Sequence, residues 1–338
     1  MDAMEADGIL VRPEDVGVVP THVHPSFMVP KMDDGAFTGE YRLVTGLSSL
    51  SPFLKPSRVP LPTVEEAFRS LAKWPYLVMA DLKSWHWQIP LNRESMRFFG
   101  TATPYGGLRL YAMQPMGYLN ATENADLVIQ AVLDPAIKQG RCARIADNLF
   151  TGGRTVKEAV DNFHMMLNLC ANSGLTFKAA KTFICPKSVT ILGKIWERGT
   201  LRPSNHLMST LSKADYPRTV KQMRSFTGSV KQMKDNLPQY HLLLQPLEKA
   251  SAGLKSAERI IWTDTLKEAF DLGKTAAAKP EILTLPKQGE KLFIFPDWSD
   301  IHQAGAAPLF VRRDGKLLKV RNFGQRLKTV KRWAMGTM

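Results

Sequence analysis

The chain of 338 residues contains only three cysteines, and their spacing matches no motif of zinc ligands. So few thiols, in an odd number, predict a reduced protein inside the cell, in the cytoplasm or the nucleus, without a disulfide framework. The sequence also lacks any run of 18 apolar residues. Its first ten residues, MDAMEADGIL, lack the basic start and apolar core of a signal peptide. We therefore expect no membrane span and no membrane partner.

Positive charge is in excess, but it is unevenly distributed. Hydrophobic residues make up 44% of the chain and charged residues 22%, which is ordinary for a globular protein of two or three domains. Lys and Arg outnumber Asp and Glu by 20 to 10 in residues 151–280 and by 11 to 5 in residues 281–338, whereas residues 1–150 hold 14 against 16. Such a basic segment suggests a polyanion partner, because neutralised phosphates release counterions. A merely soluble basic surface explains the same numbers.

The spacing of apolar residues and breakers predicts a mixture of helices and strands, the α+β class. Proline and glycine mark most of the expected boundaries. In chain order, we expect a hairpin of Phe27–Lys31 and Tyr41–Thr45, a helix over Ala121–Leu133 that Pro135 ends, a helix over Lys157–Ser173, a largely helical segment over 205–275, a linker over Pro280–Glu290, and strands over Lys291–Phe295, Ala304–Val311 and Lys316–Phe323.

Two carboxylates stand where strands are expected to end. Asp81 closes the apolar run YLVMAD, and Asp147, 66 positions later, lies in the turn of a short hairpin, RIADNLF. Two such carboxylates can hold a pair of divalent ions ~3.5–4 Å apart, which activate an attacking hydroxyl and stabilise a leaving pyrophosphate oxygen. The pattern is typical of phosphoryl transfer. A strand-end Asp that only caps a turn is the simpler explanation for either residue taken alone.

Seven segments, in order, resemble motifs of the reverse transcriptases of gypsy-type LTR retrotransposons. They are ADLKSWHWQIPL (80–91), MQPMGYLNAT (113–122), IADNLF (145–150), SGLTFKAAKTFI (173–184), ILGKI (191–195), VKQMRSFTGSVKQMKDNLPQYHLLLQPL (220–247), and IWTD with IFPDWSD (261–264 and 294–300). The resemblance covers nearly the whole chain. It implies a right-hand polymerase with fingers and palm (residues 1–200) and a helical thumb (201–278), followed by a truncated RNase H-like α/β segment (279–338).

The resemblance also implies an activity, that of an RNA-directed DNA polymerase. Such an enzyme transfers a dNMP from a dNTP to a primer 3′-hydroxyl on an RNA or DNA template, with two Mg²⁺ or Mn²⁺ ions. The residues that match functional positions of the family are Asp81 and Asp147 as metal ligands; Asn148 beside them; Lys181 as general acid toward pyrophosphate; Lys31, Arg42, His86, Gln114, Met116 and Gly117 around the nucleotide; Gly193 and Lys194 in the primer grip; and Lys221, Arg224, Lys231 and Lys234 on the thumb.

The chain departs from the family at several of these positions. Asn148 replaces a second aspartate, and its neutral amide is a poorer ligand for Mg²⁺ than a carboxylate. Ile145 replaces a tyrosine, the fingers segment Gly46–Ser51 lacks an Asp and an Arg, and His86 replaces the aromatic residue that excludes the ribose 2′-hydroxyl. We therefore expect an impaired polymerase. The alternative is a decayed protein that acts only as a nucleic-acid-binding or structural subunit.

Two expectations concern the C-terminal half. The four basic thumb residues follow one another at spacings of 3, 7 and 3, near one helical stripe that would track a phosphate backbone; a solvated face is the simpler explanation. Asp297 matches the first RNase H carboxylate, but the chain supplies no second matching acidic ligand, so we expect no RNase H activity from it alone. The sequence leaves open whether the chain dimerises or is cut from a parent polyprotein.

Overall fold

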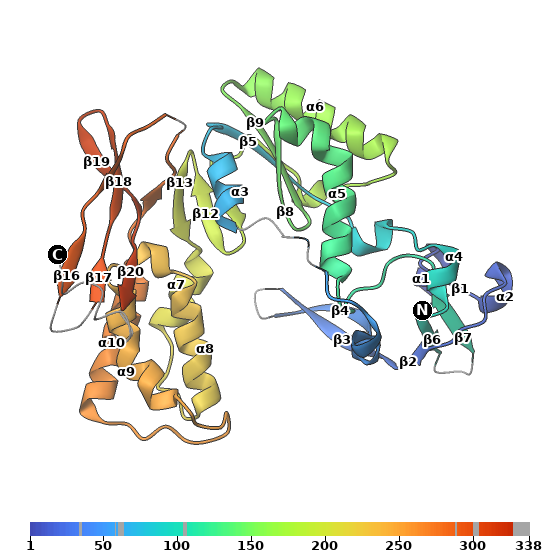
Figure 1. The fold of residues 1–338 in the computed structure, drawn as a ribbon, viewed down its shortest axis with the longest axis horizontal. Coiled ribbons are helices and arrows are strands. Elements are labelled where there is room, and N and C mark those ends of the chain that lie inside the picture. Colours follow the sequence, from blue (N-terminus) through green and yellow to red (C-terminus); the bar gives the residue numbers. More distant parts are fainter. Residues whose placement is uncertain are drawn as a thin grey trace. The chain divides into compact units, whose positions relative to one another are not determined.

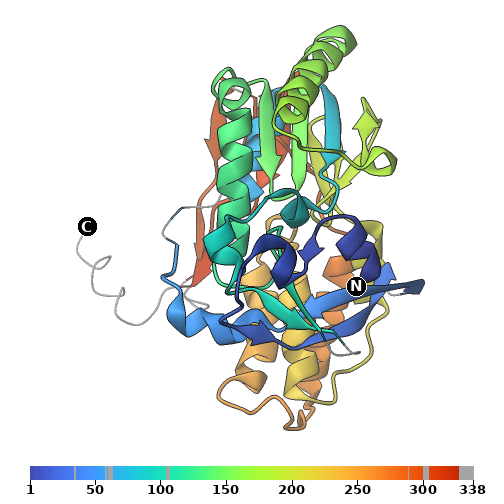
Figure 2. The same ribbon diagram turned by 90° about the vertical axis from the view of Figure 1, so that its right-hand side faces the viewer.

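The computed structural model describes residues 1–33, 36–57, 59, 64–103, 107–287, 289–299 and 304–326. The chain forms two compact units, Met1–Pro186 and Lys187–Met338, both drawn in Figures 1 and 2. The first unit contains 18 Lys+Arg and 18 Asp+Glu, and the second contains 27 and 13, so the net charge of +14 belongs to the second unit. No helix in the described ranges combines the length and the apolar character that a bilayer span requires.

A four-stranded antiparallel sheet with two helices forms the centre of the first unit. Its strand order is β10-β5-β9-β8, and α5 and α6 pack on it (Figure 1). In α6, Ala159, Phe163, Met166 and Cys170 recur at helical spacing and are buried in the common core. The bounds are β5 Tyr76–Asp81, α5 Ala121–Lys138, β8 Cys142–Ile145, β9 Asn148–Gly153, α6 Val156–Asn172 and β10 Phe183–Ile184. The predicted helix over Lys157–Ser173 is thereby confirmed.

A second sheet and a hairpin complete this unit. The sheet has the order β1-β7-β6-β2, and β3 pairs with β4 as the predicted hairpin, whose turn at Asp34 and Gly35 lies outside the described residues. The remaining elements are α1 Asp2–Ala6, β1 Leu10–Val11, α2 Pro13–Val16, β2 Val23–His24, β3 Ser26–Asp33, β4 Ala36–Thr45, α3 Val64–Leu71, α4 Arg93–Met96, β6 Gly100–Ala102, β7 Leu108–Tyr111, and the short 3-10 helices η1 Leu47–Phe53, η2 Trp85–Gln88 and η3 Ala179–Lys181.

Four helices pack around one apolar core in the second unit, as predicted for residues 205–275. Helix α8 begins with a capping box, in which Thr219 and Gln222 satisfy each other's backbone N–H groups. Its buried face is formed by Val220, Met223, Phe226 and Val230. The helices are α7 Asn205–Ser212, α8 Val220–Lys231, α9 Tyr240–Ser251 and α10 Asp264–Ala278, with the 3-10 helix η4 Lys234–Asn236.

Three antiparallel sheets accompany these helices in the second unit. Their strand orders are β11-β12-β13-β14, β15-β18-β19 and β16-β17-β20. The strands are β11 Val189–Ile191, β12 Lys194–Glu197, β13 Thr200–Pro203, β14 Leu283–Thr284, β15 Leu292–Ile294, β16 Asp297–Ser299, β17 Ala304–Ala306, β18 Leu309–Arg313, β19 Lys316–Arg321 and β20 Gly324–Arg326.

The structure corrects three predicted boundaries. Helix α5 passes through Pro135 and ends at Lys138, because the fully buried Leu133 and Ala136 hold it on the sheet despite one lost hydrogen bond. Two further corrections fall in the second unit. The expected linker 280–290 contains β14, which pairs with β13, and the expected strand 304–311 is two strands, divided at a proline that cannot donate to a ladder.

Candidate active site

Asp81 and Asp147 lie at adjacent ends of paired strands. Asp81 is the last residue of β5 and the register partner of Asn148, the first residue of β9. Asp147 occupies the second position of the two-residue turn between β8 and β9, and its carbonyl oxygen accepts a hydrogen bond from the backbone N–H of Leu82 at 3.1 Å. Ala146, at the first position, has a φ of 51°, a left-handed conformation that such a tight turn requires. The turn therefore directs Asp147 toward Asp81.

The two carboxyl groups are close enough to share a hydrogen bond when one of them is protonated. Asp81 is only 7% exposed. Burial, and after it the negative charge of Asp81, raise the pKa of Asp147 above its ordinary value. Two carboxylates that repel each other in a water-poor place favour the binding of a cation between them.

Lys181 provides one positive charge at this pair. Its Nζ lies 3.2 Å from Oδ2 of Asp81, and its side chain remains 59% exposed. The backbone holds this segment in place, since the N–H of Lys178 donates to the carbonyl oxygen of Asp81 at 2.8 Å and the N–H of Lys181 donates to that of Lys178 at 2.9 Å. Lys181 is therefore near the carboxylates, in a position from which an ammonium group can reach a bound anion.

Asn148 lies beside the pair and acts as a hydrogen-bond donor. Its Nδ2 donates to Oδ1 of Asp147 at 3.1 Å. An aspartate at this position would have added a third negative charge, whereas the amide adds none and uses one N–H to satisfy Asp147. The substitution therefore lowers the charge of the cluster and occupies one oxygen of a proposed metal ligand.

The described residues offer Mg²⁺ only a small set of ligands, the two carboxylates of Asp81 and Asp147. Among the described residues, no group of three or more His, Cys, Asp or Glu side chains is placed to hold a metal ion. Mg²⁺ commonly takes one or two protein carboxylates and completes its shell with waters and substrate phosphates. The closeness of Asp81 and Asp147, together with the raised pKa of Asp147, fits this requirement. These two side chains are the ones that would hold the ions.

His86 and Gln114 form a hydrogen-bonded pair near the start of α5. The Nε2 of Gln114 lies 2.9 Å from Nδ1 of His86 and 2.8 Å from the carbonyl oxygen of Ala121. Gln114 is 2% exposed, so its two N–H groups are directed to these two acceptors. Burial lowers the pKa of His86, which agrees with a neutral ring that accepts at Nδ1. His86 lies in η2, the 3-10 turn that follows β5.

Met116 and Gly117 lie in the loop between β7 and α5. Met116 is 40% exposed, and Gly117 has a φ of 95° with open space where a Cβ would stand. That conformation strains other residues, so glycine is required here by the backbone. The loop presents an open surface, as a pocket floor would need.

Lys31 and Arg42 project from the β3–β4 hairpin. Lys31 Nζ lies 2.6 Å from Oε2 of Glu40, and this contact lowers the pKa of the Glu40 carboxyl. The charge of Lys178 lowers it further, by a smaller amount, so the hairpin is within electrostatic reach of the segment that carries Lys181. Arg42 is the register partner of Val29. The ammonium group of Lys31 is therefore engaged by Glu40 within the hairpin.

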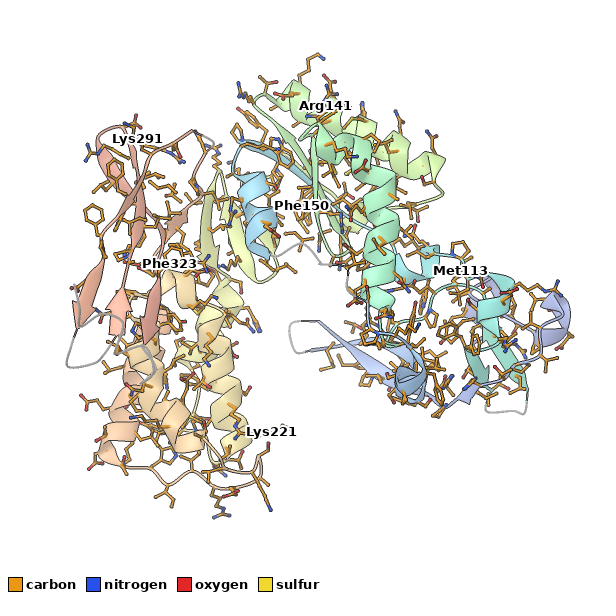
Figure 3. All side chains as sticks on the ribbon, in the orientation of Figure 1. Met113, Arg141, Phe150, Lys221, Lys291 and Phe323 are labelled. Carbon is orange, nitrogen blue, oxygen red and sulfur yellow. The ribbon has the colours of Figure 1, made fainter. Side chains whose placement is uncertain are left out.

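The basic residues of α8 are divided between solvent and structure. Lys221 is exposed in the first turn of α8 and is labelled in Figure 3. Arg224 differs, because its Nη2 donates to the carbonyl oxygens of Ser251 and Leu254 at 2.9 and 2.8 Å. These bonds tie α8 to the end of α9, so Arg224 contributes to packing within the unit.

The other two predicted thumb residues lie at the far end of α8. Lys231 Nζ lies 2.5 Å from Oε1 of Glu248, and both side chains are about half exposed, at 52% and 42%. Lys234 belongs to η4, beyond the helix, so the four residues do not share one helical stripe.

A hollow of about 1320 Å³ lies between α7 and α8 in the second unit. Two arginines, Arg218 and Arg259, and the aromatic rings of Tyr216 and Trp262 line it. Tyr216 and Trp262 are in edge-to-face contact, with ring centroids 4.9 Å apart, and Trp262 Nε1 donates to the carbonyl oxygen of Pro217 at 3.0 Å. Guanidinium groups and flat rings are a composition that suits nucleic acid. No motif in the sequence points to these residues.

Gly193 lies in the turn before β12, and Lys194 is the first residue of that strand. Gly193 has a φ of 74°, and its carbonyl oxygen accepts from the N–H of Ser204 at 2.9 Å. Lys194 is 19% exposed, and its Nζ lies 3.7 Å from Oδ2 of Asp235, whose Oδ1 lies 2.9 Å from Nε of Arg321 in a second ion pair. Lys194 therefore joins an ionic cluster within the second unit.

Asp297, the residue matched to RNase H, begins β16 and is exposed. Its register partner is Ala306 of β17. The described residues place no second and third metal-binding side chain beside it. The expectation that this chain alone has no RNase H activity stays a prediction.

Two further interactions of this unit are not predicted from the sequence. Arg144 of β8 forms an ion pair with Asp126 of α5, with both side chains almost fully buried (6% and 3% exposed). Gln130 accepts a further hydrogen bond from Arg144 at 3.2 Å. The signal was available, since Asp126 falls on the apolar face of a helix. The second is a hydrogen bond from the backbone N–H of Thr176 to Oε1 of Gln88, which no sequence pattern marks.

Comparison with known proteins places this geometry in context. No protein-family model matches the chain. The retrovirus-related Pol polyprotein from transposon 297 of Drosophila melanogaster is 24% identical over 281 residues, covering 82% of this chain and 26% of that protein. The transposon Tf2-7 polyprotein of Schizosaccharomyces pombe is 24% identical over 278 residues, covering 82% and 20%. The chain thus spans a fifth to a quarter of the length of these relatives.

Solved structures agree in fold. The foamy viral protease-reverse transcriptase dRH in complex with double-stranded DNA superposes with a TM-score of 0.84 at 16% identity, over 97% of this chain and 55% of that one. The foamy viral protease-reverse transcriptase in complex with RNA/DNA hybrid gives 0.80 at 15% identity, over 97% and 42%. The relatives are therefore retrotransposon polyproteins and the fold is that of a reverse transcriptase, which confirms the resemblance and the predicted fold class.

Proposed function

We propose that the chain is the polymerase part of a reverse transcriptase, which transfers a dNMP from a dNTP to the 3′-hydroxyl of a primer. The observation that carries the proposal is the pairing of Asp81 with Asp147, whose pKa is raised by burial and by its neighbour. Retrotransposon relatives and the shared fold favour the same reading. The division into fingers and palm, thumb and RNase H-like segment belongs to this proposal.

Each side chain has a distinct task in this proposal. Bound divalent ions would activate the primer hydroxyl and shield the leaving pyrophosphate. Asp81 and Asp147 would hold those ions, and Lys181, 3.2 Å from Asp81, would give a proton to pyrophosphate as it leaves. The neutral His86, hydrogen-bonded to Gln114, would face the sugar of the nucleotide. Template and primer lie along the basic second unit.

Primer extension tests the proposal directly. The purified chain is given a labelled primer on an RNA or a DNA template with dNTPs and Mg²⁺ or Mn²⁺. Extension is expected with both templates and should disappear in Asp147→Asn, the matched variant that keeps the shape of the side chain but not its charge. No extension with either ion, by a chain that is folded and binds the duplex, would overturn the polymerase proposal.

One observation favours a second candidate, a protein that binds nucleic acid without chemistry. The amide of Asn148 donates to Asp147, so the cluster has one negative charge fewer than three carboxylates would give. A non-catalytic protein would bind primer–template with a steep salt dependence through its second unit, and would show no dependence of that binding on Asp147. Duplex binding that is equal in wild type and Asp147→Asn, without extension by either, identifies this candidate.

A further inference from the structure

Gln88 makes an unusually complete set of hydrogen bonds next to the carboxylate pair. It is the last residue of η2. Its Nε2 donates to the carbonyl oxygens of Lys83 and Thr176, the latter at 3.1 Å. Its Oε1 accepts from the backbone N–H of Thr176 at 2.6 Å and from the Thr176 hydroxyl at 3.2 Å. Two N–H groups and two lone pairs are all that a glutamine amide has, so its capacity is fully used.

The partner of Gln88 begins the segment that ends at Lys181. The carbonyl oxygen of Thr176 accepts from the backbone N–H of Lys83 at 3.0 Å, and Phe177 forms an antiparallel bridge with Leu82. The backbone N–H of Lys178 donates to the carbonyl oxygen of Asp81 at 2.8 Å. One turn later, the ammonium group of Lys181 lies 3.2 Å from the Asp81 carboxylate. The contacts form a continuous ladder between residues 81–83 and 176–178, and Gln88 closes its open end.

We propose that Gln88 is a positioning residue, which holds the 176–181 segment so that Lys181 stays on Asp81. We call the four hydrogen bonds of Gln88 to Lys83 and Thr176 the clasp. The effect of the clasp on catalysis rests on the proposed polymerase function, whereas its effect on the position of Lys181 does not. Because η2 also carries His86, the same side chain fixes the spacing between the nucleotide side of the site and the Lys181 side. A change at Gln88 therefore acts on chemistry through Lys181, without contact with substrate.

The chemistry of the clasp distinguishes between replacements. Gln88→Glu keeps the size but removes both donors, so a carboxylate would face the carbonyl oxygens of Lys83 and Thr176. Gln88→Leu removes all four bonds without adding charge. Thr176→Val removes only the bond from the hydroxyl and serves as the mild variant, should the others fail to fold. Gln139→Leu, at the exposed C-terminal end of α5, is the matched control.

The first test measures the reactivity of Lys181 and needs no activity. Wild type and variants are treated briefly with an amine-acylating reagent, and acylation of each lysine is followed by mass spectrometry. The ratio of Lys181 to Lys157, a lysine paired with Asp161 elsewhere in the unit, is the readout. We expect the ratio to rise several-fold in Gln88→Leu and Gln88→Glu, to rise less in Thr176→Val, and to stay constant in Gln139→Leu. An unchanged ratio in Gln88→Leu and Gln88→Glu overturns the clasp.

The second test is a double-mutant cycle on the rate of primer extension. If Gln88 acts by placing a general acid, Gln88→Leu should lower kcat by about tenfold or more when Lys181 is present. In the Lys181→Met background the same change should have almost no effect, since the group it positions is gone. Independent, multiplying effects overturn the positioning role. A wild type that never extends a primer refutes the proposed function instead, and the labelling ratio still decides the clasp.

Discussion

Asn148 donates its side-chain amide to Asp147 at 3.1 Å while it stands opposite Asp81 in the β5–β9 ladder. The amide is therefore a neighbour of both proposed metal ligands and a partner of one. It reduces the repulsion that a third carboxylate would create, and it also removes a negative ligand from the site. At this position the amide thus favours the stability of the folded chain without ions, whereas a carboxylate would favour the binding of ions.

Restoring a carboxylate at position 148 should increase the affinity for ions and, with it, the polymerase activity. We expect Asn148→Asp to raise primer extension in Mg²⁺ by about tenfold or more, which is about 1.4 kcal/mol of barrier. The chain itself should extend primers faster with Mn²⁺ than with Mg²⁺, because the two ions differ in how they bind such a set of ligands. Asn148→Ala, which loses the hydrogen bond without adding charge, is the control and should gain nothing. Equal extension by the chain and by Asn148→Asp would mean that the missing carboxylate does not limit the rate.

The raised pKa of Asp147 makes a prediction about stability. In the folded state this carboxyl holds its proton to a higher pH than in the unfolded chain, so stability is lost as the pH rises from the ordinary value of 3.8 through the raised value. Asp147→Asn removes the ionisable group, so this loss of folding stability disappears. The new side chain still has an oxygen that can accept the hydrogen bond from Nδ2 of Asn148. Without divalent ions, it should melt at a higher temperature than wild type at pH 7, and the gap should narrow near pH 4. Thermal unfolding at both pH values in EDTA measures it, and a lower melting temperature at pH 7 would contradict the argument.

Lys221 and Arg224 should separate binding from packing in the second unit. Lys221→Ala removes an exposed charge, and should reduce the slope of log affinity against log salt for duplex by about one unit while leaving stability unchanged. Arg224→Ala leaves two carbonyl oxygens of the α9 end without their donor, and should cost about 1–3 kcal/mol of unfolding free energy. Filter binding at several salt concentrations and urea unfolding distinguish them. Identical effects of the two substitutions would mean that the contacts of Arg224 carry no energy.

The elements with strong periodicity could be predicted from the sequence. The stripe of Ala159, Phe163, Met166 and Cys170 specifies α6, and the apolar run that ends in Asp81 specifies β5. Pro135 shows the limit, because local propensity favours a break there and only tertiary burial on the sheet keeps the helix intact. A two-residue strand such as β14 carries too few residues for any periodicity.

The proposed site could be predicted in its residues more readily than in its contacts. Motif resemblance selects Asp81, Asp147 and Lys181, which the structure brings together. It cannot show that the charge of Arg224 is used by backbone carbonyls, because partners 27 and 30 positions away leave no local signal. The hydrogen bonds between Gln88 and Thr176 span 88 positions, and they too leave no local signal in the sequence.

The buried pair of Asp126 and Arg144 gives the last prediction. It joins α5 to β8, three residues before Asp147, and burial lowers the pKa of Arg144. Arg144→Met leaves the Asp126 carboxylate without its counter-ion in the core, which should cost about 3–5 kcal/mol of unfolding free energy. The double variant with Asp126→Leu removes both charges and should recover most of that loss. The exposed pair Lys157–Asp161 is the control, and Lys157→Met should change stability by less than about 0.5 kcal/mol. Urea unfolding measures all four proteins. If the double variant is no more stable than Arg144→Met, the ion pair contributes through shape and not through compensation of charge.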